Sequence, residues 1–269
     1  MITSKTKACG VIGWPVEHSF SPAMHNAGFA ALGLDFVYLG FAVKPNDLTV
    51  AIAGAQALGL RGLNVTIPHK AAALALCQPD ALATKVGAVN TLTFENGRCL
   101  GSNTDVHGFA MLLSELQLQP KRAVVLGQGG AARAAVAALI DGIDQITVVA
   151  RTPAPFVVAG HTIDVQPWSD AVLCTGFADC DLLVDATSRG LSDTAPFDLS
   201  PLGAGAAVVD LVVGRSTPLT AAARTRGLRA ATGTAMLLYQ GGRAFELWTG
   251  KPAPLSAMRE ALESALQTR

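Results

Sequence analysis

The chain of 269 residues has no excess of charge and little charge of either sign. Lysine plus arginine number 20, aspartate plus glutamate also number 20, and charged residues make up only 15% of the sequence. Without a basic excess to neutralise phosphates, we expect no general role in binding nucleic acid or an anionic membrane surface. Hydrophobic residues make up 50% of the sequence, which is typical of a soluble globular protein rather than a disordered chain.

Long apolar runs and paired cysteines are also lacking. No uncharged apolar run approaches the roughly 20 residues needed to span a bilayer. The first residues contain no small-residue cleavage site, so they fit a β-strand better than a signal peptide. The five cysteines are scattered, odd in number and without a C-x-x-C spacing, which predicts reduced thiols in a cytoplasmic protein. The five histidines show no metal-ligand spacing, so no metal is expected.

What the sequence does contain is a regular alternation of strand and helix patterns. In the first half, apolar strand-like runs alternate with helical patterns, which predicts a parallel sheet covered by helices. Asn96-Gly97, between two strand-like runs, predicts a β-hairpin. We expect Ser21-Pro22 to provide a helix N-cap followed by proline at the first helical position. Residues 68–77 are expected to form another helix.

The alternation restarts near residue 121 with a strand, a glycine-rich turn and an alanine-rich helix. In "VVLGQGGAARA", Gly127 allows a tight turn, Gly129 lets the backbone approach a pyrophosphate, and Ala132 permits close helix–strand packing. This is the pattern of a dinucleotide-binding loop, and an ordinary tight β–α turn is the alternative. Roughly 20 residues further on, Arg151 and Thr152 stand where an acid would favour NAD, and their donors favour the 2′-phosphate of NADP. The alternative for Arg151 is a solvated arginine at a strand end.

Small polar residues gather at the expected strand ends of the first half. Ligands of open α/β sheets bind outside the carboxyl ends of the strands, so we expect these loops to surround one cleft. Their hydroxyl and amide groups suit a polyhydroxylated ligand, and a Lys70–Asp105 pair would hold a transferable proton. Each residue alone also fits an ordinary role as a cap, a turn or a solvated side chain. The group comprises Ser19, Ser21, Asn64, Thr66, Lys70, Asn90, Thr91, Asn103, Thr104 and Asp105.

Seven motifs, in order along the chain, resemble those of the shikimate dehydrogenase family, which includes quinate/shikimate dehydrogenases and their paralogues. They are HSFSPAMHN at 18–26, NVTIPHK at 64–70, GAVNT at 87–91, GSNTD at 101–105, GQGGAARA at 127–134, DATSRG at 185–190 and MLLYQGGRAFELWTG at 236–250. The resemblance covers essentially the whole chain.

The resemblance implies an α/β fold of two domains. An open α/β substrate-binding domain is expected over residues 1–104, a Rossmann-type dinucleotide-binding domain over 105–232, and C-terminal helices packing on the first domain over 233–269. Lys70, paired with Asp105, would be the catalytic acid/base. The residues expected at the substrate, with Ser19 and Ser21 on its carboxylate, are Ser19, Ser21, Asn64, Thr66, Lys70, Asn90, Asp105 and Gln240. The residues expected at the cofactor are Gly127, Gln128, Gly129, Gly130, Ala131, Arg151, Thr152, Thr187, Ser188, Val213, Gly233 and Met236.

The implied activity is the reversible NADP-dependent reduction of 3-dehydroshikimate to shikimate in aromatic amino acid (chorismate) biosynthesis, by a cytoplasmic monomer or homodimer. One alternative is a paralogue that oxidises quinate, shikimate or a related cyclic hydroxy acid with NAD; an acid after the second strand of the nucleotide domain would have favoured it. Another alternative is a weakly catalytic nucleotide-binding regulator. In such a protein we would expect Lys70 and Asp105 to have been replaced by other residues. A folate-type dehydrogenase of similar plan would leave the paired serines unexplained.

Four departures from the family pattern bear on specificity. Val213 stands in "DLVV" where the family commonly has a tyrosine, Val106 replaces the usual glycine after "NTD", and Asp185 replaces the asparagine of N-A-T-S. Ala150 and Pro155 replace the asparagine and the second arginine of N-R-T-x-x-R, which weakens the expected 2′-phosphate clamp. Loss of one hydrogen bond to a substrate hydroxyl would slow shikimate turnover, or relax selectivity, by roughly up to tenfold.

Overall fold

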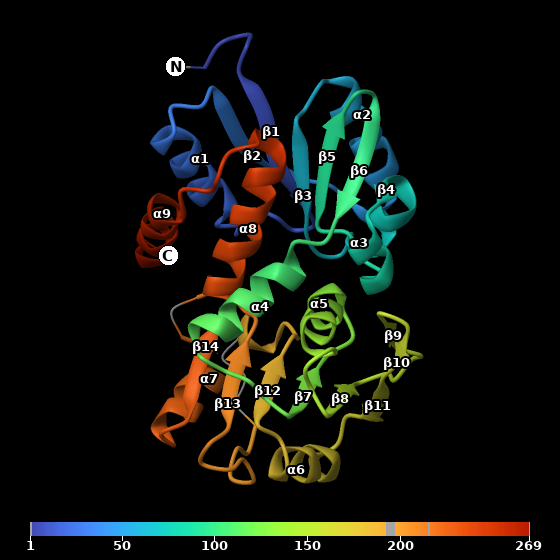
Figure 1. The fold of residues 1–269 in the computed structure, drawn as a ribbon, viewed down its shortest axis with the longest axis vertical. Coiled ribbons are helices and arrows are strands. Elements are labelled where there is room, and N and C mark those ends of the chain that lie inside the picture. The colour runs from blue at the N-terminus through green and yellow to red at the C-terminus, as the bar shows by residue number, and fades with distance from the viewer. Residues whose placement is uncertain (1, 192–196, 215, 269) are drawn as a thin grey trace. The chain divides into compact units, whose positions relative to one another are not determined.

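Two units, each with its own sheet, make up the chain in the computed structural model, which describes residues 2–191, 197–214 and 216–268 (Figure 1). Unit 1 comprises the residues up to Gly108 and those from Leu238 onward, and unit 2 is the continuous stretch Phe109–Leu237. The expected α/β fold in two parts is confirmed, and the last helices belong to the same unit as the first strands. Among the described residues, every helix is too short or too polar to span a bilayer.

The sheet of unit 1 combines parallel strands with an antiparallel hairpin. Its strands, in spatial order, are β2 (Phe36–Ala42), β1 (Lys7–Gly13), β3 (Gly62–Val65), β5 (Thr91–Glu95), β6 (Arg98–Ser102) and β4 (Gln78–Pro79). β1, β2 and β3 run parallel, β5 runs antiparallel to β3 and β6, and β4 runs parallel to β6. The predicted hairpin is confirmed: it turns at Asn96 and Gly97, whose φ angles of 50° and 72° are those of a tight two-residue turn.

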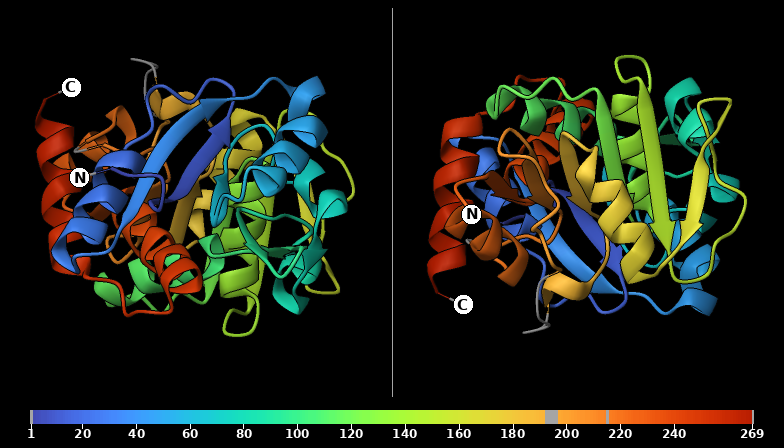
Figure 2. Two further views of the ribbon diagram at one scale, coloured as in Figure 1. Left: turned by 90° about the horizontal axis from the view of Figure 1, so that it is seen from above. Right: turned by 90° about the horizontal axis from the view of Figure 1, so that it is seen from below.

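Helices from both ends of the chain pack in unit 1. They are α1 (Ser21–Ala31), α2 (Leu48–Ala57), α3 (Ala81–Val86), α8 (Thr234–Thr249), α9 (Leu255–Gln267) and the short 3₁₀ turns η1 (Pro45–Asp47) and η2 (Ala72–Leu76), while α4 (Asp105–Glu115) starts in this unit. α9 packs along α1, so the last helix of the chain lies against the first (Figure 2). Unit 1 is therefore completed only by residues from the end of the sequence.

Two helix predictions for unit 1 are wrong. Ser21 does not cap α1; it is the first helical residue, and Phe20 at the N-cap makes no side-chain capping bond. Residues 68–77 do not form an α-helix but a turn followed by η2. The carbonyl of Lys70 accepts a hydrogen bond from the N–H of Val89 at 2.9 Å. This long-range bond takes the place of the bond to the N–H four residues later that an α-helix would make.

Buried aromatic rings join α1 and α8 to the sheet of unit 1. Trp248 is 1% exposed and donates its indole N–H to the carbonyl of Leu92 at 3.0 Å. Its ring fills the space that a side chain at Gly62 would need. His25 stacks on Tyr38 with ring centroids 4.3 Å apart, and burial lowers the pKa of His25 to about 3, so its ring is neutral.

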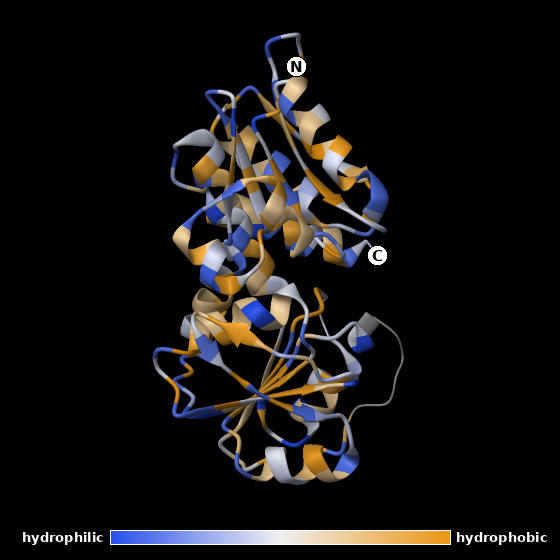
Figure 3. Ribbon diagram, turned by 90° about the vertical axis from the view of Figure 1, so that its right-hand side faces the viewer, coloured by the Kyte–Doolittle hydropathy of each residue, from blue (hydrophilic) through white to orange (hydrophobic). Residues whose placement is uncertain are grey.

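Unit 2 contains a fully parallel sheet. Its strands, in spatial order, are β11 (Asp164–Pro167), β8 (Gln145–Ala150), β7 (Arg122–Leu126), β12 (Leu182–Asp185), β13 (Ala207–Asp210) and β14 (Arg229–Thr232). Counted along the chain within this sheet, the order is the 3-2-1-4-5-6 of a doubly wound dinucleotide-binding fold. The central strands β7, β12 and β13 are mostly hydrophobic (Figure 3), as expected of parallel strands covered on both faces.

The connections of unit 2 fix where a ligand would bind. They contain α5 (Gly130–Leu139), α6 (Asp170–Ala178), α7 (Pro218–Thr225), the 3₁₀ turn η3 (Arg189–Leu191) and a small hairpin of β9 (Val157–Val158) and β10 (His161–Thr162). The winding reverses between β7 and β12, and folds of this kind bind their ligands at the carboxyl ends of the strands at that point. There a Cβ on Gly127 would lie 3.3 Å from the carbonyl oxygen of Ala186, so the loops after β7 and β12 touch.

Candidate active site

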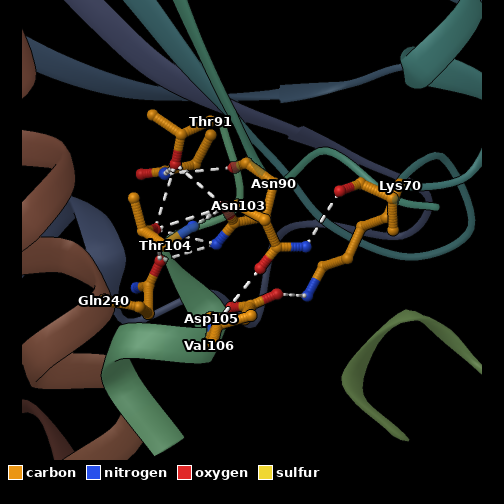
Figure 4. A network of polar contacts seen from close by, with 10 residues as sticks. Lys70, Asn90, Thr91, Asn103, Thr104, Asp105, Val106 and Gln240 are labelled. Carbon is orange, nitrogen blue, oxygen red and sulfur yellow. Dashed lines mark hydrogen bonds and ion pairs between the residues drawn. The ribbon is translucent and has the colours of Figure 1, made fainter. Parts of the chain in front are cut away.

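Lys70 and Asp105 form an ion pair in unit 1, with 2.7 Å between Nζ and Oδ2 (Figure 4). Their side chains are only 15% and 6% exposed, so the pair is largely removed from water. Lys70 lies in the turn that follows β3, and Asp105 is the first residue of α4, where the helix dipole favours a negative charge. The carboxylate therefore fixes the position of the ammonium group, an arrangement that suits a pair for proton transfer.

A buried row of amides and hydroxyls lies beside this ion pair (Figure 4). The Asn90 amide donates from Nδ2 to Thr104 Oγ1 at 3.0 Å and to Gln240 Oε1 at 3.3 Å. The backbone N–H of Thr104 donates to Asn90 Oδ1 at 2.7 Å. Thr91 Oγ1 donates to the same Asn90 oxygen at 3.1 Å. These bonds orient the Asn90 amide, and they bring Gln240 from α8 to the start of β5.

Tyr38 links two of the predicted substrate residues, although the sequence analysis did not single it out. Its hydroxyl donates to Asn64 Oδ1 at 2.7 Å, and burial raises its pKa well above the ordinary value of 10.0. A hydrogen bond with the Ser21 side chain opposes that rise. The available signal was a tyrosine in an otherwise apolar strand, because a buried tyrosine hydroxyl needs a partner.

The remaining substrate candidates differ in how many of their polar groups already have hydrogen-bond partners within the protein. Asn64 donates from Nδ2 to the Asn90 carbonyl at 3.2 Å and to Thr91 Oγ1 at 3.1 Å, so both amide hydrogens have partners within the protein. Ser19 Oγ accepts the N–H of Ser21 at 3.3 Å, which holds the two serines together at the start of α1. Thr66 is half-buried just after β3, and its N–H donates to the carbonyl of Ile12 at 2.9 Å.

The glycine loop of unit 2 has the geometry expected of a nucleotide-binding turn. Gly127 has a φ of 101°, a backbone conformation that residues with a side chain rarely adopt. Gly129 occupies the N-cap of α5. A Cβ on Gly129 would meet no atom of the protein within 4 Å, so space lies in front of the backbone there. Ala132 is fully buried between helix and sheet. Gln128 clasps the segment after β8, donating from Nε2 to the carbonyl of Ala154 at 2.8 Å and accepting its N–H at 3.2 Å.

The other cofactor candidates lie at the same carboxyl edge of the sheet of unit 2 or at the start of α8. Arg151 and Thr152 are exposed directly after β8. Thr187 donates from its N–H and its Oγ1 to Asp185 Oδ1 at 2.8 and 2.6 Å, which shapes the loop after β12. Gly130 and Ala131 open α5, Ser188 and Val213 follow β12 and β13, Gly233 precedes α8, and Met236 lies within it.

Two buried carboxylates end the neighbouring strands β12 and β13. Asp185 and Asp210 are register partners and are 1% and 0% exposed. Burial raises the pKa of Asp185, while hydrogen bonds from Thr187 and the charge of Arg189 lower it. Burial raises the pKa of Asp210, hydrogen bonds from the Thr217 side chain and the Val212 N–H oppose that rise, and the neighbouring charge of Asp185 adds a smaller increase. Because position 185 has aspartate where the family pattern has asparagine, a second buried acidic group lies beside Asp210.

Comparison with known proteins places these features in one family. A family model described as the shikimate dehydrogenase substrate binding domain matches residues 11–92, and one described as the shikimate 5′-dehydrogenase C-terminal domain matches residues 233–263. The NADP(+) shikimate dehydrogenase of Thermosynechococcus vestitus is 46% identical over an alignment 283 positions long, gaps included, which covers 99% of this chain and 98% of that protein.

Solved structures of similar chains agree. The shikimate 5-dehydrogenase of Thermus thermophilus, in complex with NADP(H) and shikimate, is 34% identical with a TM-score of 0.85, over 97% of this chain and 100% of the other. Quinate dehydrogenase from Corynebacterium glutamicum, in complex with NAD, is 31% identical with a TM-score of 0.85, over 96% and 99% of the two chains. By identity and coverage together, the chain belongs to the shikimate dehydrogenase family.

Proposed function

We propose that the chain is an NADP-dependent shikimate dehydrogenase that reversibly reduces 3-dehydroshikimate to shikimate in aromatic amino acid biosynthesis. The observation that carries the proposal is the buried Lys70–Asp105 ion pair beside the amides of Asn90 and Gln240. A ring substrate with several hydroxyl groups needs donors and acceptors of this kind. One of those hydroxyls must also exchange a proton as its carbon is oxidised or reduced. The relatives that carry this activity in their names match the chain along nearly its whole length.

Lys70 and Asp105 would perform the proton transfer. During reduction the Lys70 ammonium gives its proton to the carbonyl oxygen of the substrate, and during oxidation the neutral amine takes the proton of the hydroxyl. Asp105 keeps the amine within reach and stabilises the positive charge that appears when Lys70 is protonated. When bound, NADP supplies the hydride chemistry. Because the carboxylate already holds the amine at 2.7 Å, little reorganisation is needed before the proton moves.

The substrate would be held by the polar groups of unit 1. We propose that Ser19 and Ser21 bind its carboxylate and that Thr66, Asn90 and Gln240 bind its hydroxyls, with the Asn90 amide already oriented by Thr104. Both amide hydrogens of Asn64 and both of Asn90 already have partners within the protein, so each of these two residues would exchange one such bond in order to donate to the substrate.

Unit 2 would bind NADP. The donor set fits a dinucleotide, because open space faces Gly129 and α5 presents its first N–H groups at the turn. We propose that residues 127–131, the loop of Thr187 and Ser188, and Val213, Gly233 and Met236 surround the nucleotide. Arg151 and Thr152 would meet the 2′-phosphate. In domain terms, residues 1–104 and 233–269 would form the substrate part and 105–232 the nucleotide part.

Initial-rate kinetics test the proposal directly. Shikimate and quinate are each measured with NADP and with NAD, and we expect the highest kcat/KM for shikimate with NADP. Preference for quinate or NAD would instead support the paralogue alternative, which Val213, Ala150 and Pro155 favour. Absence of turnover with all four combinations, in a protein that still binds NADP, would support the nucleotide-binding regulator.

The cellular and assembly predictions accompany this function. We propose a cytoplasmic enzyme that acts on a small-molecule substrate without a nucleic acid or membrane partner, as a monomer or homodimer. Light scattering coupled to size-exclusion chromatography measures the mass in solution, and a mass above that of two chains would contradict this.

A further inference from the structure

His69 precedes Lys70 in the sequence and is the more deeply buried of the two, at 2% exposed. Its Nε2 lies 2.7 Å from the carbonyl oxygen of Val43. A carbonyl can only accept a hydrogen bond, so the imidazole donates its N–H. Val43 directly follows β2, and its own N–H donates to the carbonyl of Gly13 at 2.9 Å. The His69 side chain therefore connects the segment after β3 to the ends of β2 and β1.

The backbone around Lys70 is held from several other directions. The N–H of His69 donates to the Thr66 carbonyl, and the His69 carbonyl accepts the N–H of Ala73, both at 2.9 Å. The Lys70 carbonyl accepts the N–H of Val89, also at 2.9 Å. The backbone of His69 is thus bonded locally, the carbonyl of Lys70 is bonded to Val89, and the imidazole adds a bond to the segment after β2.

We propose that His69 is a positioning residue for Lys70: its bond to Val43 fixes the peptide from which the lysine reaches Asp105. The lysine side chain is long and flexible, so the ammonium can be placed reproducibly only if its backbone does not move. A displacement of about 1 Å at a reacting group costs roughly 10²-fold in rate. This proposal rests on the proposed function of Lys70 as the proton donor and acceptor.

Two substitutions separate the hydrogen bond from the volume of the ring. His69→Phe keeps a planar ring and removes the donor, whereas His69→Gln keeps an amide N–H at a similar reach. His69→Met, which lacks a donor and adapts to irregular space, replaces the phenylalanine variant if that variant does not fold. Thermal unfolding is measured for each variant, so that lost activity is not confused with lost protein.

The first readout does not depend on turnover. The protein is treated with an amine-acetylating reagent, and acetylation of Lys70 is compared by mass spectrometry with that of Lys85, which is exposed on α3. In the wild type the ion pair should protect Lys70. We expect His69→Phe to accelerate acetylation of Lys70 relative to Lys85, and His69→Gln to leave the ratio near that of the wild type. Equal ratios in the wild type and His69→Phe would overturn the proposal, whether or not the proposed function holds.

The second readout is kinetic and uses whichever of shikimate or quinate the wild type oxidises. We expect His69→Phe to lower kcat by up to about 10²-fold, with KM for the nucleotide unchanged. The deuterium isotope effect on kcat should rise for substrate labelled at the carbon that loses hydride, because the chemical step becomes slower. Loss of folded protein alone would lower kcat and leave the isotope effect unchanged, and that result would contradict a positioning role. His69→Gln should restore most of the rate.

Discussion

Replacing Lys70 with methionine removes the ammonium group and keeps most of the apolar length of the side chain. The change leaves Asp105 as a carboxylate that is only 6% exposed and has lost the cation 2.7 Å away. Breaking a buried ion pair from one side costs roughly 3–5 kcal/mol of folding stability, and we expect about 3 kcal/mol because Lys70 itself is not fully buried. For a chain of this size, that loss lowers the thermal midpoint by roughly 6–12 °C.

The effects of the same change on turnover and on stability can be separated. Loss of the proton-transfer group should reduce kcat by roughly 10²–10⁴-fold, while the nucleotide and the substrate still bind. Adding Asp105→Asn removes the unpaired charge, so the double variant should regain most of the lost stability and none of the lost turnover. Differential scanning calorimetry and initial-rate kinetics on the two variants test both parts. A single variant with full turnover would exclude Lys70 as the acid/base, and a double variant less stable than the single would refute the ion-pair argument.

Three further changes test other parts of the chain. Val213→Tyr should raise kcat/KM for shikimate by up to roughly tenfold, because it adds one hydrogen-bond donor; lower activity on every substrate would contradict this account of the position. Burial raises the pKa of Asp185 above 3.8, so the folded state keeps a proton that the unfolded chain has lost, and stability falls as pH rises through that window. Asp185→Asn should therefore raise the thermal midpoint at neutral pH and flatten its decline above about pH 4, and an unchanged midpoint would count against this. Gly62→Ala should lower the free energy of unfolding by about 1–3 kcal/mol, because the added methyl group would collide with Trp248. Gly54→Ala, whose methyl group would meet open space, should leave the free energy of unfolding undiminished. Urea denaturation measures this free energy for both variants.

Local sequence signals predicted the elements of the fold well, because most are decided by nearby residues. The hairpin at Asn96 and Gly97 follows from two residues that accept positive φ angles. One strand, glycine turn and helix near residues 122–139 indicated the dinucleotide-binding fold of unit 2, whereas the spatial order of its strands comes from the structure. The prediction of a helix at 68–77 was wrong because the Lys70 carbonyl bonds to the N–H of Val89 rather than to a helical neighbour. No local sequence pattern identifies Val89 as that partner.

The candidate site was predicted less completely for the same reason. Lys70 and Asp105 stand out by residue type at the ends of expected elements, and the structure brings them into contact. Tyr38 was missed as part of the site, and the bonding partner of His69 could not be predicted, because their polar atoms bond to Asn64 and to a backbone carbonyl that only the folded sheet places beside them. Residue type marks groups that can react, whereas the groups that hold them are found only from tertiary contacts.

The discontinuous composition of unit 1 has a consequence for how the protein is made. During synthesis, the sequence of unit 2 is finished before the ribosome reaches the helices that complete unit 1. Until then Asn90 lacks Gln240, and Leu92 lacks the indole of Trp248. Because chains fold progressively from the N-terminus as they emerge, a prematurely terminated chain would contain an intact nucleotide-binding fold and an unfinished substrate site. The capacity to act on the substrate is thus acquired late, which makes turnover a report that the chain has been translated through α8.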